Sequence, residues 1–213
     1  NLDEMTLKGY VNHIQKDALE LTMEDIISYY HLCGLTPKEK EARWLYAYTE
    51  GWISALYLLA LGYQAEGTFT TPSSITALMG KTVYFPFSDE IKDFLMTVCF
   101  FDAFTLEQAA HMWQKGGSEV LLEEIVGKNA FISWDGRSGA YQVHRIFSEF
   151  LRGLFEQKLP EEKQRLYGRA AAWYQKTGDY VPAMKYYELA QDFNGLLTVL
   201  EVDRGHSMHN EHR

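Results

Sequence analysis

Apolar residues recur with helical spacing along most of the chain, which predicts a mainly α-helical protein. Ile26, Ile27 and Tyr30 share one face of the first pattern, and Thr22 stands where an N-cap is expected. Residues 36–39 (Thr-Pro-Lys-Glu) have the form of a capping box with proline at the first helical position. The face predicted for that second helix consists of Ala42, Leu45, Tyr46 and Thr49. A third helix is predicted over residues 54–64.

The middle of the chain has the order of elements found in a winged helix. Residues 67–74 are rich in Gly, Thr, Pro and Ser, and a domain boundary is predicted there. Three helical patterns follow, one starting after Ser88, one over residues 107–114 behind the capping box 105–108, and one over residues 118–128. The convincing β signal comes next, as a hairpin of residues 131–134 and 140–143 around a Gly-containing turn.

Beyond Pro160 the sequence changes to the spacing of a tetratricopeptide-type helix pair, carried by Tyr174, Gly178, Ala183, Tyr187 and Ala190. Glycine permits the tight turn, and alanine permits close helix approach. A further helix is predicted over residues 194–202, and because one such unit cannot bury its own faces, more helices are expected beyond it. The predicted domains are a helical domain (21–66), a winged helix (67–158) and the start of a tetratricopeptide-like arm (159–213).

Composition narrows the function classes. The chain is 46% hydrophobic and 15% aromatic, which is typical of a folded protein. No apolar run approaches the roughly 18 residues of a transmembrane helix, so neither a membrane span nor a signal peptide is expected. The formal net charge of −9 disfavours a nucleic-acid surface. In winged helices that bind DNA, the third helix is the recognition helix. Here that helix carries three acidic residues, Glu119, Glu123 and Glu124, and one basic residue, Lys128, so no direct nucleic-acid contact is expected.

Several motifs suggest chemistry but favour plainer interpretations. Cys33 and Cys99 form no CxxC pair and are predicted to be buried, reduced thiols of a cytosolic protein. Residues 79–82 (Met-Gly-Lys-Thr) end like a P-loop, but Ile75 stands where the phosphate cradle requires glycine. The tail carries three histidines at intervals of three residues, His206, His209 and His212. A solvated terminal segment is the favoured interpretation, and no biological metal site is predicted. No catalytic constellation is recognised.

His144 stands where the second strand of the hairpin ends and an amphipathic helix begins. The plain interpretation is a histidine that caps this helix or bonds to a backbone carbonyl. The functional alternative is a phosphate contact, because unpaired N–H groups, the helix dipole and an imidazole N–H all favour an anion. The stripe predicted to be buried on the following helix leaves His144 outside it, with the ring expected at a partly open surface. That stripe consists of Ile146, Phe147, Phe150, Leu151, Leu154 and Phe155.

Taken in order, these signals resemble the MalT-type, LuxR-family transcriptional regulators, a group of signal-transduction ATPases with numerous domains. The resemblance extends from about residue 10 to residue 200. Its markers are Thr49-Glu50-Gly51-Trp52, His144 with Phe147, Phe150 and Leu151, and the block from Trp173 to Ala190.

The resemblance implies a place within a longer protein. Residues 1–20 would end a nucleotide-binding domain, with residues 7–14 as its last strand. The partners would be the P-loop, sensor and helix-turn-helix domains of the same chain, with self-association on activation and a cytoplasmic location. ADP or ATP would be bound by the intact parent and not by this part alone. Any ATP hydrolysis would be slow and would belong to the parent, so no enzyme activity is expected here.

The resemblance also implies site residues. In related switch ATPases the winged-helix histidine contacts the β-phosphate of ADP and holds the closed, resting state, and His144 matches it. Gly51, Trp52 and Ile53 match a Gly-x-Pro whose proline packs on adenine, with Ile53 in the proline position. The leading hypothesis is therefore a regulatory switch of an inducer-responsive activator. The alternative is a tetratricopeptide-like scaffold that binds proteins without nucleotide switching.

Overall fold

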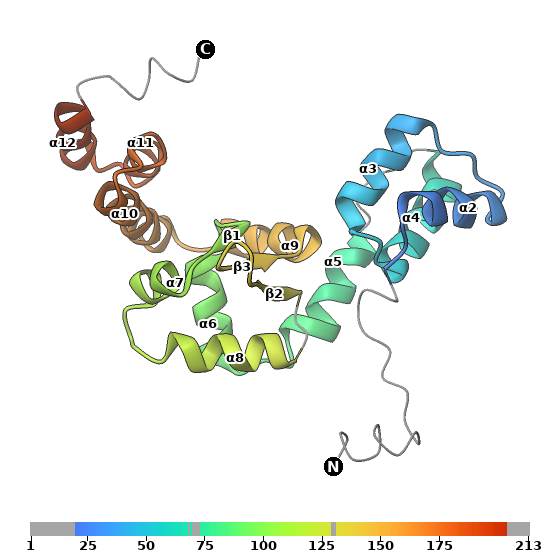
Figure 1. Cartoon of the computed structure of the whole chain (residues 1–213), viewed down its shortest axis with the longest axis horizontal. Coiled ribbons are helices and arrows are strands. Elements are labelled where there is room, and N and C mark those ends of the chain that lie inside the picture. The colour runs from blue at the N-terminus through green and yellow to red at the C-terminus, as the bar shows by residue number, and fades with distance from the viewer. Residues whose placement is uncertain (1–19, 68, 70–72, 129–130, 204–213) are drawn as a thin grey trace. The chain divides into compact units, whose positions relative to one another are not determined.

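The computed structural model describes residues 20–67, 69, 73–128 and 131–203, and it is mainly α-helical, as predicted (Figure 1). The chain divides into two units, the first ending at Gly80 and the second beginning at Lys81. The boundary predicted from composition lies earlier, between residues 66 and 67. Helix α5 (Ser73–Met79), whose range was not predicted, follows that position, and a π-helical turn, η2 (Gly80–Tyr84), spans the division.

The first unit contains α2 (Met23–Leu32), α3 (Glu39–Thr49) and α4 (Ile53–Glu66) ahead of α5. Thr22 caps α2 as predicted: its side chain accepts from the Asp25 N–H, and the Asp25 carboxylate accepts from the Thr22 N–H. The core includes Tyr30, which is fully buried and whose hydroxyl donates to the Leu56 carbonyl at 2.8 Å. This bond satisfies a buried polar group and ties α2 to α4.

Two details of the α3 prediction are wrong. The helix begins at Glu39 and not at the proline, because the Glu41 carboxylate accepts from the Lys38 N–H at 2.7 Å and fixes Lys38 as the N-cap. The buried face includes Tyr48, whereas Tyr46 is 46% exposed. The buried residues of α3 are Ala42, Leu45, Tyr48 and Thr49.

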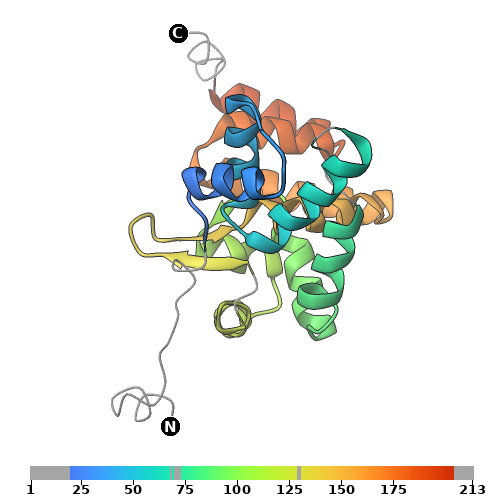
Figure 2. The ribbon, with the colours of Figure 1, turned by 90° about the vertical axis from the view of Figure 1, so that its right-hand side faces the viewer.

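The second unit begins with a winged helix. Its three helices are α6 (Asp89–Val98), α7 (Leu106–Trp113) and α8 (Ser118–Gly127), with Ser88 and Thr105 as side-chain N-caps, as predicted. The predicted hairpin is present as β2 (Ile132–Asp135) and β3 (Ala140–Val143), and its turn extends away from the helices (Figure 2). A two-residue strand that the sequence did not predict, β1 (Ala103–Phe104), pairs with β3. The antiparallel sheet therefore has the order β1-β3-β2.

Four helices follow the sheet: α9 (Arg145–Glu156), α10 (Pro160–Thr177), α11 (Tyr180–Leu189) and α12 (Phe193–Asp203). Gly178 ends α10 in the left-handed region at φ 80°, as the predicted tight turn requires. Five buried residues join the last three helices: Ala171, Ala183, Met184, Tyr187 and Val199. Within the described residues no helix has both the length and the apolar character needed to cross a membrane.

The two thiols are expected to differ sharply in reactivity. Cys99 is 2% exposed, and burial raises the pKa of its thiol to about 12, so almost none of it is thiolate at pH 8. Cys33 is half-buried, so the prediction of two buried thiols is wrong for this residue. We expect a disulfide reagent at pH 8 to modify Cys33 within minutes and Cys99 only after unfolding in guanidinium. Rapid modification of both in the folded chain, measured by peptide mass spectrometry, would contradict the burial.

Candidate functional site

His144 forms the joint between β3 and α9, as the sequence predicted. Its N–H donates to the Phe131 carbonyl at 2.8 Å, which extends the strand pairing by one residue. Its carbonyl accepts the first helical bond from Ser148 at 2.9 Å, and its ring Nδ1 accepts from the Ile146 N–H at 3.2 Å. The side chain therefore caps α9 in the way that Asn or Asp does at other helix starts.

The ring of His144 does not reach a partly open surface, so that prediction is wrong. The residue is 5% exposed, and the Phe131 ring lies edge-on to the imidazole at 5.1 Å. Because Nδ1 accepts a backbone N–H, the neutral ring carries its proton on Nε2. The plain interpretation, a helix-capping histidine, is the role that the geometry shows.

The buried face of α9 agrees with the sequence pattern at five of its six predicted positions. Leu154 is half-buried and Ser148, which the pattern did not include, is buried. The Ser148 hydroxyl donates to the Asp102 carboxylate at 3.2 Å. The five confirmed positions are Ile146, Phe147, Phe150, Leu151 and Phe155.

A polar cluster that no sequence pattern predicted fixes the start of β1 against α9. Arg152 donates to the carbonyls of Cys99 and Phe100 at 3.3 and 3.1 Å and to the Asp102 carboxylate at 2.9 Å. The Asp102 carbonyl in turn accepts from the Val143 N–H at 2.9 Å. Strand β3, helix α9 and the end of α6 are thereby held together next to His144. The spacing of Ser148 and Arg152, one helical turn apart, is the one sequence signal that could have indicated this cluster.

Gly51 lies in a turn that excludes any side chain. Its φ is 79°, and a Cβ atom placed on it would lie 2.4 Å from the Leu21 carbonyl oxygen. The Gly51 carbonyl accepts from the Leu21 N–H at 3.0 Å, and the Gly51 N–H donates to the Thr49 hydroxyl at 3.3 Å. The missing side chain therefore makes room for the chain's own backbone, which gives this glycine a structural role.

Trp52 and Ile53 occupy the start of α4. Trp52 is the N-cap and is half-buried, whereas Ile53 is 41% exposed. Tyr57 and Leu61 follow Ile53 at intervals of four residues and are also exposed, so α4 carries an apolar stripe on its surface. Of the four residues predicted to contact nucleotide, the first unit holds Gly51, Trp52 and Ile53, and the second unit holds His144.

The structure describes two of the other motifs, the Gly-Lys-Thr tripeptide and the acidic helix α8. Gly80, Lys81 and Thr82 lie in the η2 turn, so this Gly-Lys-Thr belongs to a helical segment and not to a phosphate-binding loop. In α8 the glutamates 119, 123 and 124 are exposed, and Lys128 pairs with Glu124 at 2.7 Å. The three tail histidines and residues 7–14 lie outside the described residues. Within the described part of the chain, no three His, Cys, Asp or Glu residues gather where they could hold a metal ion.

Comparisons with known proteins agree with this architecture. Residues 80–163 match the MalT winged helix domain family. A relative from Vibrio cholerae, an "HTH-type transcriptional regulator MalT", is 28% identical over 165 residues, which cover 72% of this chain and 18% of the relative. The protein of the same name from Vibrio parahaemolyticus is 26% identical over 185 residues, 81% of this chain and 20% of the relative.

The chain thus spans about a fifth of the length of the curated relatives that it matches. The matched residues run from the η2 turn through the winged helix into the first turn of α10. Residues 80–163 thus have the fold of a winged helix and are similar to the MalT winged helix domain, within a chain that resembles MalT regulators over most of its length.

Proposed function

We propose that this chain is an internal regulatory part of a MalT-type, LuxR-family transcriptional activator. The observation that carries the proposal is a MalT-family winged helix joined directly to tetratricopeptide-like helices. Helix α10 is attached to the end of α7 by two bonds: the His111 ring lies 3.1 Å from the Arg169 carbonyl, and the Arg169 guanidinium donates to the Met112 carbonyl at 3.0 Å. The winged helix then acts as a connector between a switch domain and a helical sensor arm.

DNA binding is assigned to another part of the parent regulator. A recognition helix must approach phosphate groups, and the exposed glutamates of α8 would be repelled by them. Lys128, which could offset them, is paired with Glu124. Promoter recognition would belong to a helix-turn-helix domain, as the name of the relatives indicates for those proteins.

In this proposal the intact parent binds ADP at rest and exchanges it for ATP on activation. The exposed Ile53 side chain at the start of α4 offers an apolar surface of the kind on which a base can pack. His144 would donate from Nε2 to a phosphate, and this requires the ring to leave its buried place beside Phe131. A switch of this kind requires a ligand that contacts its resting and active states differently, and the exchange of ADP for ATP would supply that difference. No catalytic step is assigned to this part of the chain.

Two variants of His144 in the intact regulator separate the capping role from the phosphate role. His144→Ala removes both the cap and the imidazole donor, so the free energy of unfolding should fall by about 0.5–2 kcal/mol. It should also weaken ADP binding by about ten- to a hundredfold, the value of one charge-assisted hydrogen bond. His144→Asn keeps a cap and should recover the stability without recovering the ADP affinity. Calorimetric titration and urea unfolding measure the two effects.

Wild-type ADP affinity in His144→Ala would leave the histidine with its capping role alone. The same conclusion would follow if ADP affinity tracked stability, falling in the alanine variant and returning in the asparagine variant. If the phosphate role holds, the alanine variant should also activate transcription without inducer, because loss of ADP releases the resting state.

A protein-interaction scaffold without nucleotide switching is the second candidate. The observation that favours it is the apolar surface of α12, where Phe193, Leu197 and Val202 are each more than half exposed. In the regulator such a surface would be covered by further helices of the arm, in a cytoplasmic protein that self-associates when active. A parent that binds no nucleotide and yet captures protein partners through α12 would support the scaffold.

A further inference from the structure

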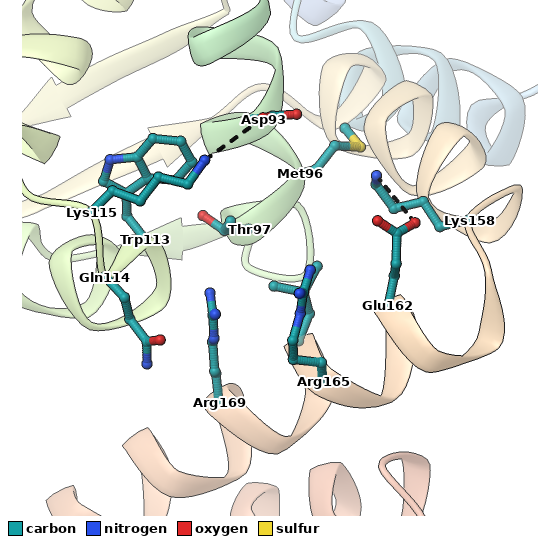
Figure 3. A pocket seen from close by; sticks show the side chains of 11 residues that line it. Asp93, Met96, Thr97, Trp113, Gln114, Lys115, Lys158, Glu162, Arg165 and Arg169 are labelled. Atoms are coloured by element: carbon teal, nitrogen blue, oxygen red, sulfur yellow. Dashed lines mark ion pairs between the residues drawn. The ribbon is translucent and has the colours of Figure 1, made fainter.

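A cavity of about 470 Å³ lies between the winged helix and α10, within the second unit (Figure 3). One wall is formed by α6 and the residues that follow α7, and the opposite wall by α10 and the residue Lys158 that precedes it. This volume is in the range of small-molecule sites. The cavity is unrelated to His144, which does not line it.

Cations outnumber carboxylates around this cavity, in a chain whose net charge is −9. The two carboxylates, Asp93 and Glu162, each lie 3.8 Å from one lysine, Lys115 and Lys158 respectively. At that length both ion pairs are weak: the first is exposed and the second is half-buried. Because each carboxylate is paired with a lysine, the excess positive charge around the cavity is carried by two arginines, Arg165 and Arg169.

The two arginines extend from successive turns of α10 toward α6 (Figure 3). Among the described residues neither of them pairs with a carboxylate. Arg169 donates to the Met112 carbonyl, and Arg165 has no hydrogen bond or ion pair within the described chain. Like charges one turn apart disfavour a helix. Partial burial and the charge of Arg165 lower the pKa of the Arg169 guanidinium, so its positive charge is held at a cost that a bound anion would offset.

We propose that this cavity binds the phosphate group of a small phosphorylated molecule, with Arg165 and Arg169 as its main ligands. A phosphate monoester carries a charge of about −2 at neutral pH, which matches the two unneutralised guanidinium groups. Its three terminal oxygens can accept from two arginines at once, whereas a carboxylate is satisfied by a single bidentate arginine. Lys115 and Lys158 lie at the sides of the same space and add attraction at longer range.

A ligand held in this position would connect two parts of the second unit. It would contact α10 through the arginines and the winged helix through the residues around Trp113 and Thr97. Since it binds the packed arrangement and not the separated one, it would stabilise the attachment of α10 to the winged helix. The site would thus let a phosphorylated metabolite act on the junction independently of any nucleotide bound elsewhere.

The test uses the 213-residue chain and phenyl phosphate as the probe, with phenylacetate at equal ionic strength as the carboxylate comparison. Phenyl phosphate should bind saturably at millimolar concentration, and phenylacetate should bind at least tenfold more weakly. In ¹H–¹⁵N spectra the indole N–H of Trp113, which lines the cavity, should shift on titration, while that of Trp134 on β2 should not.

Arg165→Gln should weaken phenyl phosphate binding by about ten- to a hundredfold. It should not lower the melting temperature, because Arg165 is exposed, glutamine is a good helix former, and the repulsion between Arg165 and Arg169 is removed. The matched control is Arg137→Gln, which removes the same charge from the exposed turn between β2 and β3 and should leave the affinity unchanged. The proposal would be overturned if phenyl phosphate binding did not saturate or if phenylacetate bound equally well. It would also be overturned if the two variants lost the same affinity or if the indole signals of Trp113 and Trp134 shifted equally.

Discussion

Replacement of Phe147 by alanine is expected to lower the free energy of unfolding of the second unit by about 3–5 kcal/mol. Phe147 is fully buried on the inner face of α9, with its ring stacked on Phe150 at 6.2 Å and the Phe131 ring at 6.4 Å. Truncation removes the apolar surface of a large side chain and leaves a cavity that its neighbours on a short helix and a hairpin cannot fill. A loss of this size is a large fraction of the stability of a domain.

The measurement is hydrogen exchange by mass spectrometry on peptides of α6 and α9, which gives the opening free energy of this unit directly. Phe85→Ala is the matched control, because Phe85 lies in the same unit and is 63% exposed. Its effect should stay within about 0.5 kcal/mol. Similar losses in the two variants would show that the core does not depend on the α9 face in the way described.

Gly51→Ala is expected to destabilise the first unit by about 2–5 kcal/mol. A left-handed backbone costs a residue with a side chain about 1–2 kcal/mol, and forcing a methyl group into packed backbone adds about 1–3 kcal/mol. Both contributions apply here, since φ is 79° and the added carbon would lie 2.4 Å from one backbone atom of Leu21 and 2.6 Å from another. The turn that joins α3 to α4 would have to move, and the hydrogen bond from the Leu21 N–H to the Gly51 carbonyl would be lost.

Gly34→Ala separates these two contributions. Gly34 lies in the same unit at φ 75°, and an added Cβ would meet no atom within 4 Å. It should therefore show the backbone cost alone, about 1–2 kcal/mol. Urea unfolding, followed through peptides of α2 and α4, gives the free energy of unfolding of both variants. Equal losses of stability would mean that the Leu21 backbone moves away from the added methyl group at no energetic cost.

Local chemistry explains which parts of the fold could be predicted from the sequence. Thr22, Ser88 and Thr105 each cap a helix whose first N–H groups lie within three residues, so the pattern and the structure agree. The α3 cap failed for an equally local reason. Two acidic residues near the start of the helix could accept a hydrogen bond from the N-cap N–H. The prediction assigned this role to Glu39, whereas in the structure Glu41 accepts from the Lys38 N–H.

The position of the His144 ring could not be predicted in this way. A helical wheel places side chains on a helix, but His144 is an N-cap with φ −58° and ψ 135°, outside the helical region. Its ring is covered by Phe131, whose place depends on the pairing of the hairpin and not on the pattern of α9. Helix periodicity therefore predicted the buried face of α9 and was wrong for the residue immediately before it.

Contacts between distant segments account for the other omissions. Strand β1 is two residues long, too short for any alternating pattern, and it is identified as a strand through its pairing with β3. Arg165 and Arg169 were visible in the sequence one helical turn apart, but the cavity they line exists because α10 packs against α7 and leaves a space beside α6. Neither feature is encoded in a short window of residues.

The order β1-β3-β2 has a consequence for how the protein is made. The central strand β3 is the last of the three to be synthesised, so β1 leaves the ribosome well before its partner exists. The β2–β3 hairpin can close as soon as its own residues emerge, whereas Ala103 and Phe104 must wait for Gln142 and Tyr141. During translation the winged helix can thus complete its sheet in one late step, after α6, α7 and α8 have already had time to form.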